Sequence, residues 1–294
     1  MKDRVIIFGS AGQLGRELKK KFINKFLVYS LNKKSKIYEG DITKFKTLEK
    51  TIVKIRPKII INAAAYTKVD EAEKEKNICK KVNHIAVKNI AKLSKKYNFL
   101  LIHYSTDYII NNHKKKFLGS FPHKIKTTPI NYYGKTKLDG EIEIFKNSHK
   151  FLILRTSWLY SLYKKNFLTT ILKKINNRED IKVVKDQIGT PTSTKFLSDI
   201  SYYLVNKYKD NKKIKLVLNT VPNGHTSWFS FAKEINKISF KKRIKKIKIK
   251  AITSDKLNLE AKRPLYSKLD NQNLLRHVNI PIKSWRYYLK MLLK

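Results

Sequence analysis

The stretch MKDRVIIFGSAGQLG, residues 1–15, is a short apolar run that ends in three glycines, Gly9, Gly12 and Gly15. The run predicts a strand over residues 4–9, followed by a helix over residues 13–26. Gly9 would close a tight turn, Gly12 would let the backbone approach a pyrophosphate without a Cβ, and Gly15 would let the helix pack closely on the strand. The helix N-terminus would then face the phosphates. The stretch predicts a dinucleotide-binding unit, and a glycine turn without a ligand is the alternative for this motif alone.

The pattern beyond this unit alternates apolar runs with helical periodicity, which is typical of a parallel sheet covered by helices. We expect further strands at residues 26–30, 58–63, 99–104 and 150–156, and helices at 48–56, 71–97 with a break near Lys80, and 131–145. After Arg155 the order becomes irregular, with helices expected at 166–176, 194–208, 228–237 and 285–293, and strands at 181–184, 215–219 and 247–252.

These elements predict an α/β fold, a Rossmann-like doubly wound parallel sheet with a smaller C-terminal substrate-binding lobe. We expect residues 1–157 to form the NAD(P)-binding domain, with a strand and helix returned to it from about residues 181–220. Residues 158–294 would mainly form the substrate-binding lobe.

Composition narrows the class of protein. The chain has 294 residues, 41% of them hydrophobic, which suffices for a large core. It has no run of eighteen apolar residues, and its N-terminus enters a strand, so we expect an unexported chain without a membrane partner. The single cysteine, Cys79, excludes an internal disulfide and a multi-cysteine metal site. We expect a half-buried thiol in a reducing, cytoplasmic compartment.

The net charge of +44 raises the question of a nucleic-acid partner. Only nine of the 66 basic residues are arginine, and the lysines are spread from Lys2 to Lys294 without a single basic segment. Nucleic-acid readers rely more on arginine. The pattern favours the codon drift of an AT-rich genome and no nucleic-acid partner, although the charge favours anionic ligands such as a nucleotide-sugar.

The second expected strand ends in YSLNKK, residues 29–34, where a dinucleotide fold reads the cofactor ribose. An acidic residue there would bind the 2′-hydroxyl of NAD, and none is present. Ser30, Lys33 and Lys34 would instead bind a 2′-phosphate. This favours NADPH, with NADH still open because lysine is abundant throughout the chain.

Tyr133 and Lys137 are four residues apart on one expected helix, so they share a face. A nearby ammonium would lower the pKa of the phenol toward the working pH and favour proton transfer. Ser105, Thr106 and Asp107 follow the expected strand 99–104 as a loop at its carboxyl end, where a hydroxyl could hold a substrate carbonyl. The pair and the loop together predict hydride chemistry.

Seven segments resemble the extended short-chain dehydrogenase/reductases, and among them the dTDP-4-dehydrorhamnose reductases. They are GSAGQLG (9–15), NAAAYT (62–67), HYSTDY (103–108), YGKTK (133–137), RTSW (155–158) and, further along, DQIGTPT (186–192) with RPLYSKL (263–269). The resemblance implies reduction of dTDP-4-dehydro-L-rhamnose at C4 to dTDP-L-rhamnose with NAD(P)H, in dTDP-rhamnose and surface polysaccharide biosynthesis.

The resemblance also assigns roles to residues of this chain. Tyr133 would donate the proton, Lys137 would bind the ribose and support the phenol, and Thr106 would hold the substrate oxygen. Asp107 and Trp158 would contact the sugar nucleotide, although Trp158 could instead be a core residue. The cofactor would be bound by Gly9, Gly12, Gln13, Leu14, Gly15, Ser30, Asp41, Ile42, Ala63, Ala65, Tyr66, Thr67, Tyr133 and Lys137.

One family feature transfers poorly. Some members bind Mg²⁺ at a dimer contact through glutamates, and Glu17 matches one of these positions, but Lys195 stands at the other. A lysine does not ligate a hard dication, so we expect no metal site, and a homodimer stays open. The segment 111–126, between the expected strand 99–104 and the helix 131–145, is longer and more basic than is usual in the family, and it would border the substrate cleft.

Two other functions remain open at this level. A related nucleotide-sugar epimerase or dehydratase would use the same sheet with retained NAD⁺. A non-catalytic NAD(P)-binding regulatory subunit would explain the charge.

Overall fold

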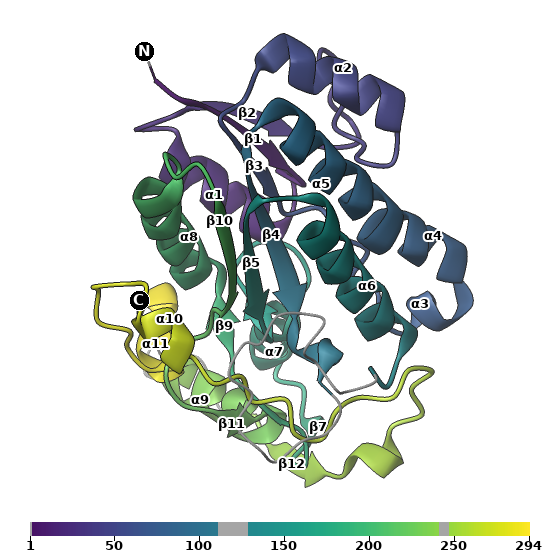
Figure 1. Ribbon diagram of the computed structural model, residues 1–294. Coiled ribbons are helices and arrows are strands. Elements are labelled where there is room, and N and C mark those ends of the chain that lie inside the picture. The colour runs from purple at the N-terminus through teal and green to yellow at the C-terminus, as the bar shows by residue number, and fades with distance from the viewer. Residues whose placement is uncertain (1, 111–128, 241–246) are drawn as a thin grey trace.

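The computed structural model describes residues 2–110, 129–240 and 247–294, so the basic segment 111–126 lies outside the described residues. Its centre is a parallel sheet of six strands in the order β10-β5-β4-β3-β1-β2 (Figure 1). The strands are β1 (Arg4–Phe8), β2 (Leu27–Leu31), β3 (Ile59–Asn62), β4 (Leu100–Thr106), β5 (Lys150–Thr156) and β10 (Ile214–Asn219).

Helices cover both faces of this sheet (Figure 1). One face carries α1 (Gln13–Phe22) and α8 (Thr194–Tyr208), and the other carries α2 (Phe45–Ile55), α5 (Ala86–Tyr97) and α6 (Tyr132–Asn147). Strands buried on both faces read as continuous apolar runs, as β1 and β3 do. The prediction of a Rossmann-like α/β sheet is therefore confirmed.

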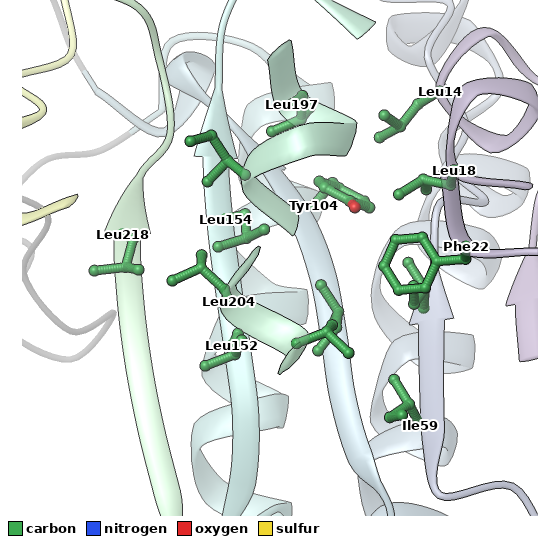
Figure 2. Packing of buried hydrophobic residues seen from close by; sticks show 14 of the residues in the cluster. Leu14, Leu18, Phe22, Ile59, Tyr104, Leu152, Leu154, Leu197, Leu204 and Leu218 are labelled. Atoms are coloured by element: carbon green, nitrogen blue, oxygen red, sulfur yellow. The ribbon is translucent and has the colours of Figure 1, made fainter. Parts of the chain in front are cut away.

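The packing on the α1 face follows from the spacing of its apolar residues. Leu14, Leu18 and Phe22 recur every four residues, so they form one stripe on α1. Figure 2 shows this stripe directed at the sheet beside Tyr104, with Leu197 of α8 on the same layer. Each fully buried side chain of this size contributes about 1.5–3 kcal/mol to stability.

The strand order reverses between β1 and β3, because the chain passes from β2 across β1 to β3. In open parallel sheets, ligands bind at the carboxyl ends of the strands beside such a switch point. The turn Gly9–Gly15 after β1 and the segment after β3 both lie at this edge.

The C-terminal lobe surrounds its own apolar cluster, which includes Tyr160, Phe231 and Trp285. It contains α7 (Phe167–Asn176), α9 (Trp228–Phe240) and α11 (Trp285–Leu293), whereas α10 (Gln272–Leu275) packs Leu274 into the core of the main sheet beside β10. Outside the main sheet, three pairs of short strands form in this part of the chain. They are β7 (Ile181–Val184) with β12 (Ile249–Ile252), β6 (Leu159–Tyr160) with β9 (Thr192–Ser193), and β8 (Ile188–Gly189) with β11 (Thr226–Ser227). The predicted return to the main sheet from residue 181 differs at β7, which pairs within the lobe.

Several boundaries differ from the prediction. Helix α1 ends at Phe22 instead of residue 26, because the chain turns back and packs the Phe26 ring 5.4 Å from that of Phe22. The helix expected over 71–97 is divided into α3 (Glu71–Lys74), α4 (Lys76–Lys80), a π-helical turn (Lys81–Ile85) and α5. The π turn directs Asn83 at the backbone of Tyr66, where it bonds both the N–H and the carbonyl.

Cys79 is fully buried, not half-buried as expected, because it packs against Tyr133 and Ala72. Within the described ranges, the structure contains no helix long and apolar enough to cross a membrane.

Candidate active site

A cavity of about 400 Å³ opens at the carboxyl ends of β1 and β3. Gly9 has a positive φ of +74°, and a Cβ there would lie 2.6 Å from the backbone nitrogen of Ala64, so only glycine fits. The lining residues are Gly9, Ala11, Gly12, Asn32, Lys33, Lys34, Gly40, Ile42, Ala63, Ala64, Ala65, Tyr66, Ile78 and Val82. The glycines leave backbone groups accessible to a pyrophosphate, and the apolar lining residues can contact a nucleotide base, so the cavity suits a dinucleotide.

The end of the cavity near β2 is basic. Lys33 and Lys34 line it, and their ammonium groups fit an additional phosphate on the cofactor ribose. Ser30, which was expected to join them, does not line the cavity, and its hydroxyl is buried. Ile42 lines the cavity as expected, whereas Asp41 beside it does not. Despite partial burial, hydrogen bonds from Thr43 hold the pKa of Asp41 below its ordinary value.

Besides Ser30, Asp41, Tyr133 and Lys137, four residues expected to bind the cofactor lie off the cavity lining. Gly15 packs under the turn, since a Cβ there would lie 2.3 Å from the carbonyl of Gly9. Leu14 points into the core, and the side chain of Gln13 accepts hydrogen bonds from Ser161 and Asn166. Thr67 is exposed. Gln13 and Leu14 can therefore meet a phosphate only through backbone N–H groups at the start of α1.

Strand β4 and helix α6 bring the three predicted catalytic residues together. Thr106 is the last residue of β4, which corrects the expectation that it lies in a loop, because pairing with β5 continues to Thr156. Helix α6 begins beside it, where Asn131 accepts a hydrogen bond from the N–H of Gly134. Tyr133 is 9% exposed, and its phenol lies within reach of the Thr106 hydroxyl.

Lys137 lies one turn further along α6 and is almost fully buried. Its Nζ donates a hydrogen bond to the Tyr104 carbonyl at 2.7 Å and lies 3.2 Å from Nε2 of His103. Burial lowers the pKa of Lys137 to about 8. This lysine can change its charge near neutral pH.

The expected lowering of the Tyr133 pKa is not found. Burial raises the pKa of the phenol above its ordinary value, and the Thr106 hydrogen bond offsets this only in part. The nearby Asp107 raises it further. Desolvation of the buried phenol dominates over the charge of Lys137, and it depends on the folded chain and not on the spacing of the two residues.

Asp107 follows Thr106 in a short 3₁₀ turn, Asp107–Ile109. Burial raises the pKa of its carboxyl to about 6, against hydrogen bonds from Ser267 and Thr106. Thr106 donates to Oδ1 of Asp107 at 3.2 Å. A carboxyl and a hydroxyl are thus held together next to the Tyr133 phenol.

Trp158 lies between the sheet and the lobe and is half-buried, with a positive φ of +46°. One face of its indole stacks on Trp228 with 3.6 Å between ring centroids. Gly189 is in close contact with the same ring, since a Cβ there would approach it to 2.5 Å. The partner ring and the glycine hold the indole in place.

Sequence reasoning gave no role to several polar residues buried under this site. Asn62, the last residue of β3, pairs in register with His103 in the middle of β4, and their side chains contact each other at 3.2 Å. Arg155 and Glu141 form a fully buried ion pair, with 2.6 Å between Nη2 and Oε2. An arginine inside the apolar run of β5 was the available signal, because a buried charge requires a partner.

The two positions considered for Mg²⁺ lie apart from any cluster of ligands. Glu17 lies beside the phenol of Tyr163, and Lys195 forms an ion pair with Asp199. Across residues 2–110, 129–240 and 247–294, no group of three or more histidine, cysteine or acidic residues could hold a metal ion.

Comparisons with known proteins agree with this geometry. A family model described as RmlD substrate binding domain matches residues 2–294. The chain is 31% identical over 293 residues to dTDP-4-dehydrorhamnose reductase of Salmonella typhimurium, which covers 98% of this chain and 96% of the relative. It is 32% identical over 292 residues to the protein of the same name from Aggregatibacter actinomycetemcomitans, with 98% and 97% covered.

Solved structures give the same result. The crystal structure of dTDP-4-dehydrorhamnose reductase from Bacillus anthracis in complex with NADP has a TM-score of 0.88 and 33% identity, covering 99% of each chain. A UDP-glucose 4-epimerase from Thermus thermophilus, at 12% identity and a TM-score of 0.79, shares the fold alone. With the full-length match to the family model, these relatives show that the chain belongs to the dTDP-4-dehydrorhamnose reductase family.

Proposed function

We propose that this chain reduces the C4 ketone of dTDP-4-dehydro-L-rhamnose to give dTDP-L-rhamnose, with NADPH as the hydride donor. Family membership supports the reaction. The observation that supports the site is the meeting of Thr106, Tyr133 and Lys137 at the sheet edge that carries the glycine turn.

Tyr133 is the proton donor in this proposal. When hydride reaches C4, the ketone oxygen becomes an alkoxide, and the Tyr133 hydroxyl gives it a proton. Because burial raises the pKa of the phenol, Tyr133 is fully protonated at neutral pH and ready to donate. The Thr106 hydroxyl, which lies beside the same phenol, would turn from Asp107 to donate to the ketone oxygen.

Lys137 restores the proton. Its pKa of about 8 lies below that of the Tyr133 phenol, so a proton moves from the ammonium to the phenolate with a favourable free energy. The ammonium also stabilises the phenolate by charge in a buried setting, where such attraction is stronger than in water. Solvent then reprotonates the lysine.

NADPH is the preferred cofactor in this proposal. Lys33 and Lys34 line the cavity at its β2 end. A 2′-phosphate would supply the negative charge and the acceptor oxygens for their ammonium groups. The relative from Bacillus anthracis was solved with NADP.

The test is Tyr133→Phe, assayed by oxidation of NADPH with dTDP-4-dehydrorhamnose. Loss of a proton donor costs about 10²–10⁴-fold in turnover, and NADPH binding measured by fluorescence should stay within about twofold. Tyr132→Phe removes the neighbouring hydroxyl from the same helix and serves as the matched control. Turnover within a few-fold of the wild type for Tyr133→Phe would refute the assignment.

A further inference from the structure

Three buried side chains form a chain of hydrogen-bonding contacts that ends on the catalytic lysine. The backbone N–H of Ala64 donates to Oδ1 of Asn62 at 3.2 Å. Nδ2 of Asn62 lies 3.2 Å from Nδ1 of His103, and Nε2 of His103 lies 3.2 Å from Nζ of Lys137. Asn62, His103 and Lys137 are each no more than 2% exposed.

This chain fixes the position of the proton on His103. An N–H group can only donate, so Ala64 identifies the amide oxygen of Asn62 and leaves Nδ2 as the group that faces the imidazole. Nδ2 is itself a donor, so Nδ1 of His103 must accept. His103 is neutral, because burial and the adjacent Lys137 lower its pKa well below the ordinary value. A neutral ring that accepts at Nδ1 carries its proton on Nε2.

The Nε2–H of His103 therefore points at Nζ of Lys137. An ammonium has only donors and would oppose this N–H, whereas a neutral amine can accept from it through its lone pair. The amine can at the same time donate to the Tyr104 carbonyl, as it does at 2.7 Å. We propose that His103 is a positioning residue that favours the amine form of Lys137 and so helps Lys137 to pass its proton to Tyr133. The proton transfer to Tyr133 rests on the proposed function.

Other groups around Lys137 act differently. Glu141, on the same helix, raises the pKa of Lys137 by charge, and its carboxylate is bound by Arg155. Cys79 of α4 acts in the same direction. Tyr133, one turn back on α6, is a neutral phenol below its raised pKa. Among the described residues, His103 is the titratable side chain within hydrogen-bonding distance of Nζ.

The first test uses the wild-type protein. A long-range ¹H–¹⁵N correlation spectrum distinguishes the two tautomers of a neutral histidine, and the chain has seven histidines to resolve. The His103 signals, assigned by their absence in His103→Leu, should show a proton on Nε2 and a bare Nδ1 at neutral pH. A proton on Nδ1 would overturn the proposal.

The second test removes the donor that holds His103 in this tautomer, without adding a charge. In Asn62→Leu, Nδ1 no longer faces a donor, so the proton can move to Nδ1 and Nε2 can accept from the lysine ammonium. The pKa of Lys137, followed by its ¹³Cε resonance, should rise by about one unit, the size of one hydrogen bond. The alkaline limb of kcat/KM should move with it.

The matched comparison is the same substitution in a His103→Leu background, where no imidazole can transmit the change. There Asn62→Leu should leave the Lys137 titration within about 0.3 units, and an equal shift in both backgrounds would overturn the proposal. The tautomer and the titration are both read without substrate. A protein that lacks reductase activity would contradict the proposed function and leave these readings intact.

Discussion

Removal of the buried amine in Lys137→Met should change how the stability of the protein depends on pH. Lys137 is almost fully buried, and its pKa falls from an ordinary value of 10.5 to about 8 on folding. The folded state therefore binds fewer protons than the unfolded state between these values, and unfolding takes up a proton. Stability of the wild type should rise as pH increases from 8 toward 10.5, because the cost of burying the ammonium disappears.

The magnitude follows from the two pKa values. A difference of one unit corresponds to about 1.4 kcal/mol, so the buried ammonium costs about 3 kcal/mol at pH 7 and about 1 kcal/mol at pH 9.5. Methionine has no such cost at either pH. The substitution also removes the hydrogen bond to the Tyr104 carbonyl, worth about 1 kcal/mol or more, but this loss does not vary with pH.

The assay is urea unfolding of wild type and variant at both pH values. The free energy of unfolding of the wild type minus that of Lys137→Met should increase by about 2 kcal/mol from pH 7 to pH 9.5. Lys135→Met changes an exposed lysine of the same helix and should leave the pH dependence of the wild type unaltered. A wild-type minus Lys137→Met difference that is constant with pH would refute the reasoning.

Three further changes test other parts of the structure. Gly9→Ala strains a residue at φ +74° and drives a Cβ into the loop after β3, so thermal unfolding should show a loss of about 1–3 kcal/mol and NADPH should bind more weakly. Lys33→Ser with Lys34→Ser should raise the KM for NADPH about tenfold or more while the KM for NADH stays unchanged in steady-state assays. Glu141→Gln removes the carboxylate that forms a fully buried ion pair with Arg155, so urea unfolding should show a loss of about 3–5 kcal/mol.

The sheet could be predicted from sequence because its strands are short apolar runs bounded by turn residues. Strand β5 matches the expected residues, and β1 differs by one residue. Helix ends were less predictable, since they depend on packing. Nothing in the local sequence of residues 13–26 indicates that Phe26 turns back to contact Phe22. The π turn at Asn83 likewise depends on Tyr66, a residue distant in sequence.

The components of the site could be predicted from spacing, but their electrostatics could not. Tyr133 and Lys137 share a face of α6 by helix periodicity alone. The pKa shifts of both arise from burial in the folded chain, which spacing does not describe, so the predicted lowering of the Tyr133 pKa is wrong. The role of His103 depends on a contact across two strands and a helix.

Burial of both partners suits a reductase in particular. A raised pKa keeps the Tyr133 phenol protonated, which is the form that a proton donor needs at the moment when hydride arrives. In the proposed mechanism, the phenolate that remains after this transfer takes its next proton from the Lys137 ammonium. With the pKa of Lys137 near 8, ketone reduction is supported below that pH and loses its source of protons above it. The reverse oxidation needs the phenol to release its proton, and it is favoured on the alkaline side.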